Sequence, residues 1–220
     1  MHLFGLFFSD GTAPSNVLIP VSFRPTGPPA MKNTIVITGT PGVGKTTVAR
    51  ELARADGYRL IELNSLAKEA GALSGEDPER GAAIIDEAKL KREIAKALKA
   101  DGPKFIVEGH YGEVVPPKYV ERAVVIRLDP RILRLRLVER GYPPSKVDEN
   151  LQAEILDSCL VNAVEAFGEE AVLEVDATGL DFQRLVASVR EAINGRGLPP
   201  GSVNWVERLQ KEGALHDFLR

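Results

Sequence analysis

Short apolar runs alternate with segments of helical periodicity along most of the chain. Runs with the length and β-branched character of buried strands occur at residues 34–38, 58–63, 104–108, 122–128 and 171–175. Between them, apolar residues recur every three or four positions, which predicts helices at 47–54, 64–70, 83–100, 130–139, 145–167 and 181–193. Strands that alternate with helices predict an α/β fold, in which a five-stranded parallel sheet has helices on both faces.

The two ends of the chain depart from this pattern. Residues 1–30 hold a short apolar patch followed by a linker rich in proline and glycine, so we expect a disordered leader that can be removed without effect. The folded domain is then expected over 31–195, with an exposed turn at 71–82 where Gly, Asp, Glu and Pro gather. Residues 196–220 are expected to form a tail with one short amphipathic helix.

Composition narrows the class of protein. Hydrophobic residues make up 44% of the chain and charged residues 27%, as in an ordinary globular protein. The net charge of −3 provides no basic field, so we expect no direct sequence-specific binding of nucleic acid. No apolar segment reaches the length of a membrane helix, so no membrane partner is expected. The single cysteine, Cys159, excludes an internal disulfide and fits a cytoplasmic protein, or a nuclear one in a eukaryote.

A phosphate-binding motif occupies the first strand-to-helix connection. Residues 39–46 read G-x-x-x-x-G-K-T, directly after the strand at 34–38. Such a loop wraps its backbone N–H groups around nucleotide phosphates, its lysine reaches the β and γ phosphates, and its hydroxyl holds Mg²⁺. A chance glycine-rich turn is the alternative, which the flanking strand and helix disfavour. The motif predicts ATP and Mg²⁺ as cofactors, with Gly42, Gly44, Lys45, Thr46 and Thr47 in contact with the nucleotide.

A second group of polar residues follows the strand at 104–108. That strand ends on Glu108, and His110 comes two residues later. Ligands of open α/β sheets lie at the carboxyl ends of the strands, so Glu108 is expected to hold Mg²⁺ through water. His110 is a catalytic candidate that would orient a water or contact a phosphate. The alternative is a loop histidine without a function.

Six arginines lie between residues 122 and 140. A solvated helix face paired with glutamates accounts for Arg122, Arg131 and Arg136. Arg140 differs, because it stands where a helix ends and a turn begins, at the position of a mobile lid. Planar guanidinium groups suit phosphate, so Arg140 is predicted to bind the nucleotide and to neutralise the transferred phosphoryl group.

The assembled motifs resemble the nuclear-type adenylate kinase family, whose members also act as ATPases in small ribosomal subunit biogenesis. The resemblance covers about residues 33–193 and is carried by 39–47, 107–110, 139–142 and 149–155. It implies a nucleoside monophosphate (NMP) kinase fold with an NMP-binding insertion near 62–85 and a short lid near 139–149. It also implies AMP or another NMP as substrate, and a small-subunit ribosomal protein and pre-ribosomal particle as partners.

The resemblance assigns further site residues, with departures. Lys68 stands where the family has its AMP-binding arginine, and a lysine is a point charge that grips phosphate less firmly. Gln152, beside Glu154, is implied as a second substrate-binding residue. Glu108 replaces the usual aspartate and reaches one methylene further. The turn at 177–179 would lie beside adenine and offer backbone contacts and one hydroxyl.

Three functions remain open from the sequence. The first is transfer of a phosphoryl group from ATP to AMP, giving two ADP, with associated ATPase activity. The second is a ribosome assembly factor that ATP hydrolysis switches, with little kinase activity and with His110 orienting the attacking water. The third is a kinase for a nucleoside or another small metabolite. The acid next to His110 and the pair Gln152 and Glu154 favour the first two.

Overall fold

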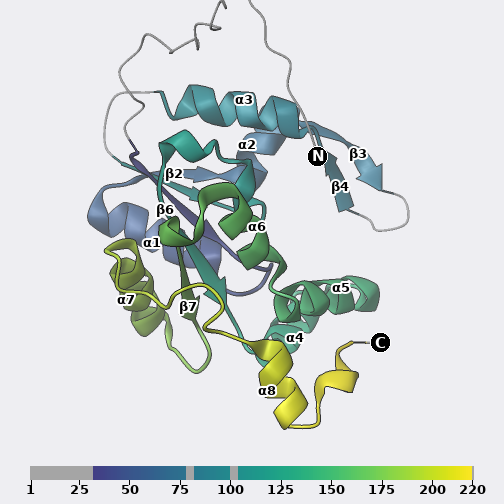
Figure 1. Cartoon of the computed structure of the whole chain (residues 1–220). Coiled ribbons are helices and arrows are strands. Elements are labelled where there is room, and N and C mark those ends of the chain that lie inside the picture. The colour runs from purple at the N-terminus through teal and green to yellow at the C-terminus, as the bar shows by residue number, and fades with distance from the viewer. Residues whose placement is uncertain (1–31, 78–81, 100–103, 220) are drawn as a thin grey trace, which may run out of the picture.

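In the computed structural model, which describes residues 32–77, 82–99 and 104–219, five parallel strands form the central sheet (Figure 1). The strand order is β2-β5-β1-β6-β7, so the first strand lies in the middle. The bounds are β1 Thr34–Thr38, β2 Arg59–Glu62, β5 Phe105–Glu108, β6 Val120–Arg127 and β7 Val172–Asp176. The predicted fold class and all five predicted core strands are confirmed.

Helices cover both faces of the sheet, as the uninterrupted apolar strands require. Helices α1 (Lys45–Asp56) and α7 (Phe182–Ile193) pack on the face that includes Ile35 and Ile37. Helices α2 (Leu63–Glu69), α3 (Glu87–Ala97) and α6 (Ser158–Phe167) pack on the opposite face with Val36. Because side chains alternate along β1, the two halves of the core meet at this strand.

The carboxyl edge of the sheet gathers the functional segments. β1 pairs with β5 on one side and with β6 on the other, so the loop after β1 lies between the ends of both neighbours. This is the switch point at which open α/β sheets bind ligands. Helix α4 (Pro130–Glu139) starts there after β6, with the predicted aspartate cap: Asp129 accepts a hydrogen bond from the Arg131 N–H at 2.8 Å.

The insertion after α2 differs from the sequence prediction. The first part of the predicted helix at 83–100 is strand β4 (Ala82–Ile85), which pairs antiparallel with β3 (Leu73–Asp77) where an exposed turn was predicted. A short apolar run cannot be assigned to helix or strand by periodicity alone. Helix α3 begins only after Asp86, whose side chain caps it by accepting from the Lys89 N–H at 2.9 Å.

The predicted helix at 145–167 is two helices. Helix α5 (Pro144–Ile155) ends before Asp157, which has φ 58, and α6 begins at Ser158. Asp157 is the one non-glycine residue with positive φ in the described ranges, and aspartate tolerates this conformation better than most residues. The apolar stripe seen in the sequence therefore continues across a break that its periodicity did not reveal.

The segment after α7 is packed against the domain. It contains α8 (Trp205–Lys211) and a short 3-10 turn, η4 (Leu215–Asp217). The expected amphipathic helix is present, but Trp205, Leu209 and Phe218 belong to the same core cluster as α1 and α7. The other short turns are η1 Gly112–Val114, η2 Pro117–Tyr119 and η3 Glu169–Ala171. The expected leader at 1–30 lies outside the described residues, and no described helix is long and apolar enough to cross a membrane.

Candidate phosphoryl transfer site

The loop between β1 and α1 is held tightly by its glycines. Gly39 has φ 136, and a Cβ there would lie 2.4 Å from the Ile126 carbonyl oxygen. Gly42 has φ 99, and its Cβ would lie 2.9 Å from Leu133 Cδ1. Gly44, with φ 112, is the N-cap of α1 and provides no side-chain cap. The loop therefore presents the N–H groups and the positive dipole end of α1, which fits the phosphates of ATP.

Lys45 lies at the start of α1 and is nearly buried, with 7% of its surface exposed. Its Nζ donates to the Thr40 carbonyl oxygen at 3.1 Å, within the same loop. Burial lowers the pKa of Lys45, and the nearby carboxylate of Glu108 acts in the opposite direction. A nucleotide phosphate would be a better partner than a carbonyl for this desolvated cation.

Thr46 and Glu108 meet beside Lys45. Burial raises the pKa of Glu108, while the charge of Lys45 and the nearby Thr46 hydroxyl oppose the rise. A hydroxyl and a carboxylate provide the hard oxygen ligands that Mg²⁺ prefers. The described residues contain no group of three or more His, Cys, Asp and Glu side chains placed to hold a metal. Mg²⁺ at Thr46 and Glu108 would thus take further ligands from phosphate and water.

His110 lies in the same region in a neutral form. Burial, followed by the charges of Lys45 and Lys146, lowers its pKa to about 4. Its ring packs edge-on against Tyr111, with centroids 3.8 Å apart. At neutral pH the imidazole can donate or accept a hydrogen bond but carries no charge.

A cavity of about 470 Å³ lies next to the phosphate-binding loop. Thr40 and Pro41 line it on the loop side, and His110 and Tyr111 line it after β5. The rest of its wall combines the polar residues Asn64, Glu113, Lys146, Glu149, Asn150, Ser158 and Asn162 with Ile85, Tyr142, Ala153 and Cys159. Asn162 Nδ2 donates to Glu113 Oε1 at 3.1 Å, and the Tyr111 hydroxyl donates to Asn64 Oδ1. The cavity has the size and polarity of a small-ligand site.

The sequence analysis did not identify these amide residues. Asn64 was interpreted as a helix start, and Asn150 was noted only within the motif at 149–155. Helical spacing could have found Asn150, because α5 turns residues 146, 149, 150 and 153 toward the cavity. No comparable signal exists for Asn162, because the break at Asp157 sets the direction of α6.

The two residues that were expected to bind substrate lie in different places. Lys68 lines a neighbouring hollow of about 290 Å³ that shares Asn64 and Tyr111 with the larger cavity. Gln152 does not lie there: it lines a separate cavity together with Arg134 and Phe218. Gln152 thus lies on the opposite face of α5 from Asn150, and its role in substrate binding stays a prediction.

The arginines between residues 122 and 140 also differ in position and contacts. Arg140 caps the end of α4, is exposed, and lies close enough for its charge to lower the pKa of Lys45. Arg131 pairs with Asp129 at 2.8 Å and Glu212 at 2.7 Å, as expected for a surface residue. Arg136 was assigned to the solvated face, but its Nη1 donates to the Gly42 carbonyl oxygen at 3.3 Å. Arg136 is thus a structural neighbour of the phosphate-binding loop.

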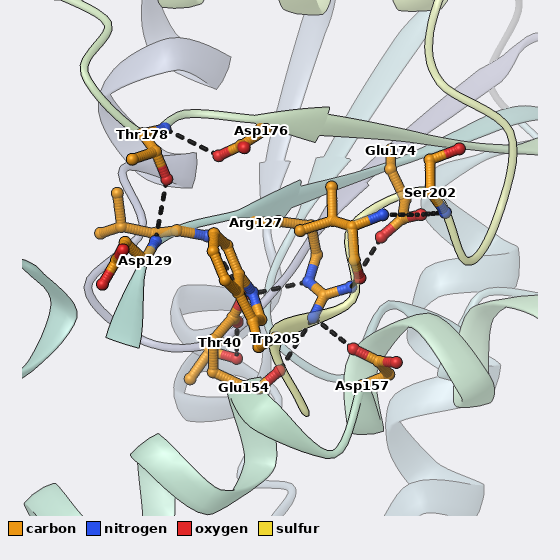
Figure 2. A network of polar contacts seen from close by, with 12 residues as sticks. Thr40, Arg127, Asp129, Glu154, Asp157, Glu174, Asp176, Thr178, Ser202 and Trp205 are labelled. Atoms are coloured by element: carbon orange, nitrogen blue, oxygen red, sulfur yellow. Dashed lines mark hydrogen bonds and ion pairs between the residues drawn. The ribbon is translucent and has the colours of Figure 1, made fainter. Parts of the chain in front are cut away.

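The turn at 177–179 makes hydrogen bonds within the protein, which occupy part of its donors and acceptors. Thr178 Oγ1 accepts from the Asp129 N–H at 3.0 Å, and the Thr178 N–H donates to Asp176 Oδ1 at 2.9 Å (Figure 2). The hydroxyl proton is the part of this side chain that remains for a ligand.

Comparisons with known proteins agree with this geometry. The family model described as AAA domain matches residues 35–157, and with this fold and phosphate-binding loop the chain belongs to that family. Two archaeal relatives are each named "Putative adenylate kinase". The one from Methanocaldococcus jannaschii is 37% identical over 174 residues, which cover 79% of this chain and 93% of the relative. The one from Methanothermobacter thermautotrophicus is 42% identical over 172 residues, covering 78% and 96%.

A solved structure supports the fold. The shikimate kinase from Bacteroides thetaiotaomicron superposes with a TM-score of 0.52 at 18% identity, covering 73% of this chain and 98% of that chain. At this identity the likeness concerns the fold alone.

Proposed function

We propose that the protein is an ATP-dependent nucleoside monophosphate kinase that transfers a phosphoryl group from ATP to AMP, giving two ADP. One observation carries the proposal: a cavity of about 470 Å³ is lined by Thr40 and Pro41 of the phosphate-binding loop itself. A second substrate held there would lie next to the γ-phosphoryl group. The names of the archaeal relatives support a nucleotide as that second substrate.

The proposed chemistry is transfer by positioning and charge. Lys45 and Arg140 neutralise the phosphoryl group, while the N–H groups at the start of α1 hold the phosphates. Mg²⁺ at Thr46 and Glu108 would offset the remaining negative charge of the phosphates. An oxygen of the AMP phosphate forms the new bond to phosphorus as the bond to the ADP oxygen breaks. This oxygen is already anionic at pH 7, so the transfer needs no general base.

The acceptor would extend from the loop toward α2. Lys68 and Tyr111 face the hollow that adjoins the cavity, and Lys68 would attract the acceptor phosphate. Asn150 and Asn162 offer both donors and acceptors to a base or sugar.

A hydrolytic function in ribosome assembly is the second candidate. It is favoured by His110, which lines the cavity and is neutral, so that it can accept a hydrogen bond from a water. In that function a ribosomal protein or pre-ribosomal particle would be the partner, and ATP hydrolysis would time its release. A nucleoside or small-metabolite kinase would use the same loop with a different acceptor.

A single assay separates these functions. The purified protein is incubated with Mg-ATP and with AMP, GMP, CMP, UMP or no acceptor, and ADP formation is measured. We expect AMP to raise ADP formation well above the acceptor-free rate, and Lys45→Ala to remove both. If ADP forms at the same rate with and without every monophosphate, the kinase proposal is wrong and hydrolysis is the activity.

A further inference from the structure

A buried carboxylate joins the phosphate-binding loop to the C-terminal segment (Figure 2). Glu154, near the end of α5, is 2% exposed. Its Oε2 accepts from the Thr40 hydroxyl at 2.6 Å, and its Oε1 accepts from the Trp205 Nε1–H at 3.0 Å. The Leu128 N–H and Arg127 Nε also donate to Oε1, at 3.1 Å and 3.0 Å. Both oxygens are thus fixed in place by four donors from three segments.

Arg127 anchors this carboxylate from the other side. It is 2% exposed and forms ion pairs with Glu154, with Asp157 and, at 2.6 Å, with Glu174. The other oxygen of Glu174 accepts from the Ser202 N–H at 2.9 Å. The segment that leads into α8 is therefore tied to the same arginine that orients Glu154.

Thr40 is bound at two points. Its hydroxyl donates to Glu154, while its carbonyl oxygen accepts from Lys45 Nζ. Rotation of Thr40 would move both the loop that surrounds the phosphates and the oxygen that receives the lysine. The orientation of Thr40 consequently depends on Glu154, and Trp205 holds Glu154.

We propose that Trp205 is a positioning residue of the nucleotide site, acting through Glu154 to hold Thr40 and the phosphate-binding loop in the geometry that binds ATP. The inference rests on ATP binding, as in the proposed function, but not on the identity of the acceptor. A purely structural Trp205 would contribute apolar packing alone, so the role of its N–H distinguishes the two.

The test compares nucleotide affinity with stability in the full chain. Trp205→Phe keeps an aromatic ring but removes the N–H donor, and Thr40→Val removes the hydroxyl at the other end of the connection. We expect each to raise the Kd for ATP, measured by calorimetry without acceptor, by about three- to tenfold. Thr40→Ser, which restores the hydroxyl, should recover most of the affinity lost in Thr40→Val.

The double variant tests whether the two residues act together. Because both act on Glu154, we expect Thr40→Val with Trp205→Phe to raise Kd by less than the product of the single effects. Leu209→Val is the matched control: Leu209 is fully buried in the same helix and has no polar atom in the network. It should lower Tm and leave Kd unchanged.

The chain has one tryptophan, so its fluorescence reports on this connection alone. We expect saturating ATP to change the emission of Trp205 in the wild-type protein and to change it much less in Thr40→Val. The proposal is overturned if Trp205→Phe lowers Tm but leaves the Kd for ATP unchanged. It is also overturned if ATP does not change the emission of Trp205 in the wild-type protein. Binding of ATP without phosphorylation of AMP would overturn the proposed acceptor and leave this inference standing.

Discussion

Lys45 is a charged side chain that is almost completely buried. Its charge lowers the stability of the fold, whereas in the proposed reaction the same charge stabilises the transferred phosphoryl group. Burial opposes its charge, and its Nζ donates to the Thr40 carbonyl oxygen, which is a neutral partner. Such a cation costs folding free energy and is useful only when a phosphate is bound.

We therefore predict that Lys45→Ala lowers phosphoryl transfer by at least about 10²-fold, the effect of removing one donor to developing charge. Its Tm should stay the same or rise slightly, because a poorly compensated buried charge is removed. Coupled measurement of ADP formation and thermal unfolding checks both effects. Near wild-type turnover would show that Lys45 has no part in the reaction.

His110 gives a pH dependence of stability. Its pKa is lowered to about 4 in the folded protein, against an ordinary value of 6.5. The unfolded chain therefore takes up a proton first as the pH falls. The stabilisation from neutral His110 is complete above pH 6.5 and is lost as the pH falls toward 4.

We predict that wild-type protein loses more unfolding free energy between pH 7 and pH 4 than His110→Asn does. The difference should be about 2–3 kcal/mol from a shift of this size. Urea denaturation at each pH measures it. Parallel curves for the two proteins would mean that His110 has an ordinary pKa.

His110 also distinguishes hydrolysis from transfer. Transfer to AMP uses an anionic nucleophile, whereas hydrolysis needs an oriented water. We predict that His110→Ala lowers acceptor-free ATP hydrolysis more than ADP formation with AMP. A base with pKa near 4 removes protons weakly, so we expect the gap to reflect orientation and to fall below the 10²-fold typical of general bases. Equal losses in the two assays would assign His110 to phosphate binding or loop geometry.

Sequence reasoning worked best for residues whose position follows from chain continuity. Lys45 and Thr46 start the helix after β1, and Glu108 ends β5, so the pairing of these two strands brings the three residues together. It did not give the position of Gln152, because the face that α5 turns to the cavity depends on tertiary packing. It also did not foresee the role of Arg127, whose ion-pair partners lie 27 to 47 residues away in the chain.

At the scale of elements, the break between α5 and α6 decides which side chains meet. Asp157 adopts φ 58 and places its carboxylate against Arg127. The break sets the direction of α6, which carries Asn162 to the cavity that Asn150 also lines. The apolar stripe in the sequence predicted a single helix over 145–167. One residue in the left-handed conformation does not interrupt the periodicity of that stripe, so the break was not predicted. The hairpin of β3 and β4 was missed for a related reason, because its second strand is a short apolar run.

We predict that Asp157→Asn destabilises the protein by about 1 kcal/mol and Asp157→Leu by about 2–3 kcal/mol. Asparagine keeps the tolerance for positive φ and loses the charge facing Arg127, whereas leucine loses both. Guanidinium denaturation of the two variants measures the difference. Equal stability of Asp157→Leu and wild type would show that neither the turn nor the ion pair matters.

At the scale of the whole molecule, the C-terminal segment completes the core. Trp205 and Leu209 are fully buried among residues of the earlier helices, and Leu198 forms an antiparallel bridge with Glu174. The sequence showed the amphipathic helix but not its docking surface. The apolar face of this helix packs on an apolar surface of the domain, and that surface exists only once the sheet has folded.

We predict that a chain ending at Gly197 is strongly destabilised. Loss of Trp205 alone removes burial worth about 3–5 kcal/mol, and Glu154 and Glu174 would lose the donors that this segment provides. For a domain of this size that corresponds to a fall in Tm of about 10 °C or more. Circular dichroism on heating measures it. A truncated chain with the wild-type Tm would show that the segment is a dispensable tail.

The central position of β1 has a consequence for how the protein is made. Strand β1, the first in the described part of the chain, pairs with β5 and β6, which are synthesised roughly 70 to 90 residues later. The charge of Arg127 is fully compensated only after Glu154, Glu174 and the segment at Val203 have been synthesised. Non-local pairing of this kind slows folding and leaves the nascent chain exposed to aggregation. We therefore expect the domain to close only when nearly the whole chain has been synthesised, with little opportunity to fold in stages during translation.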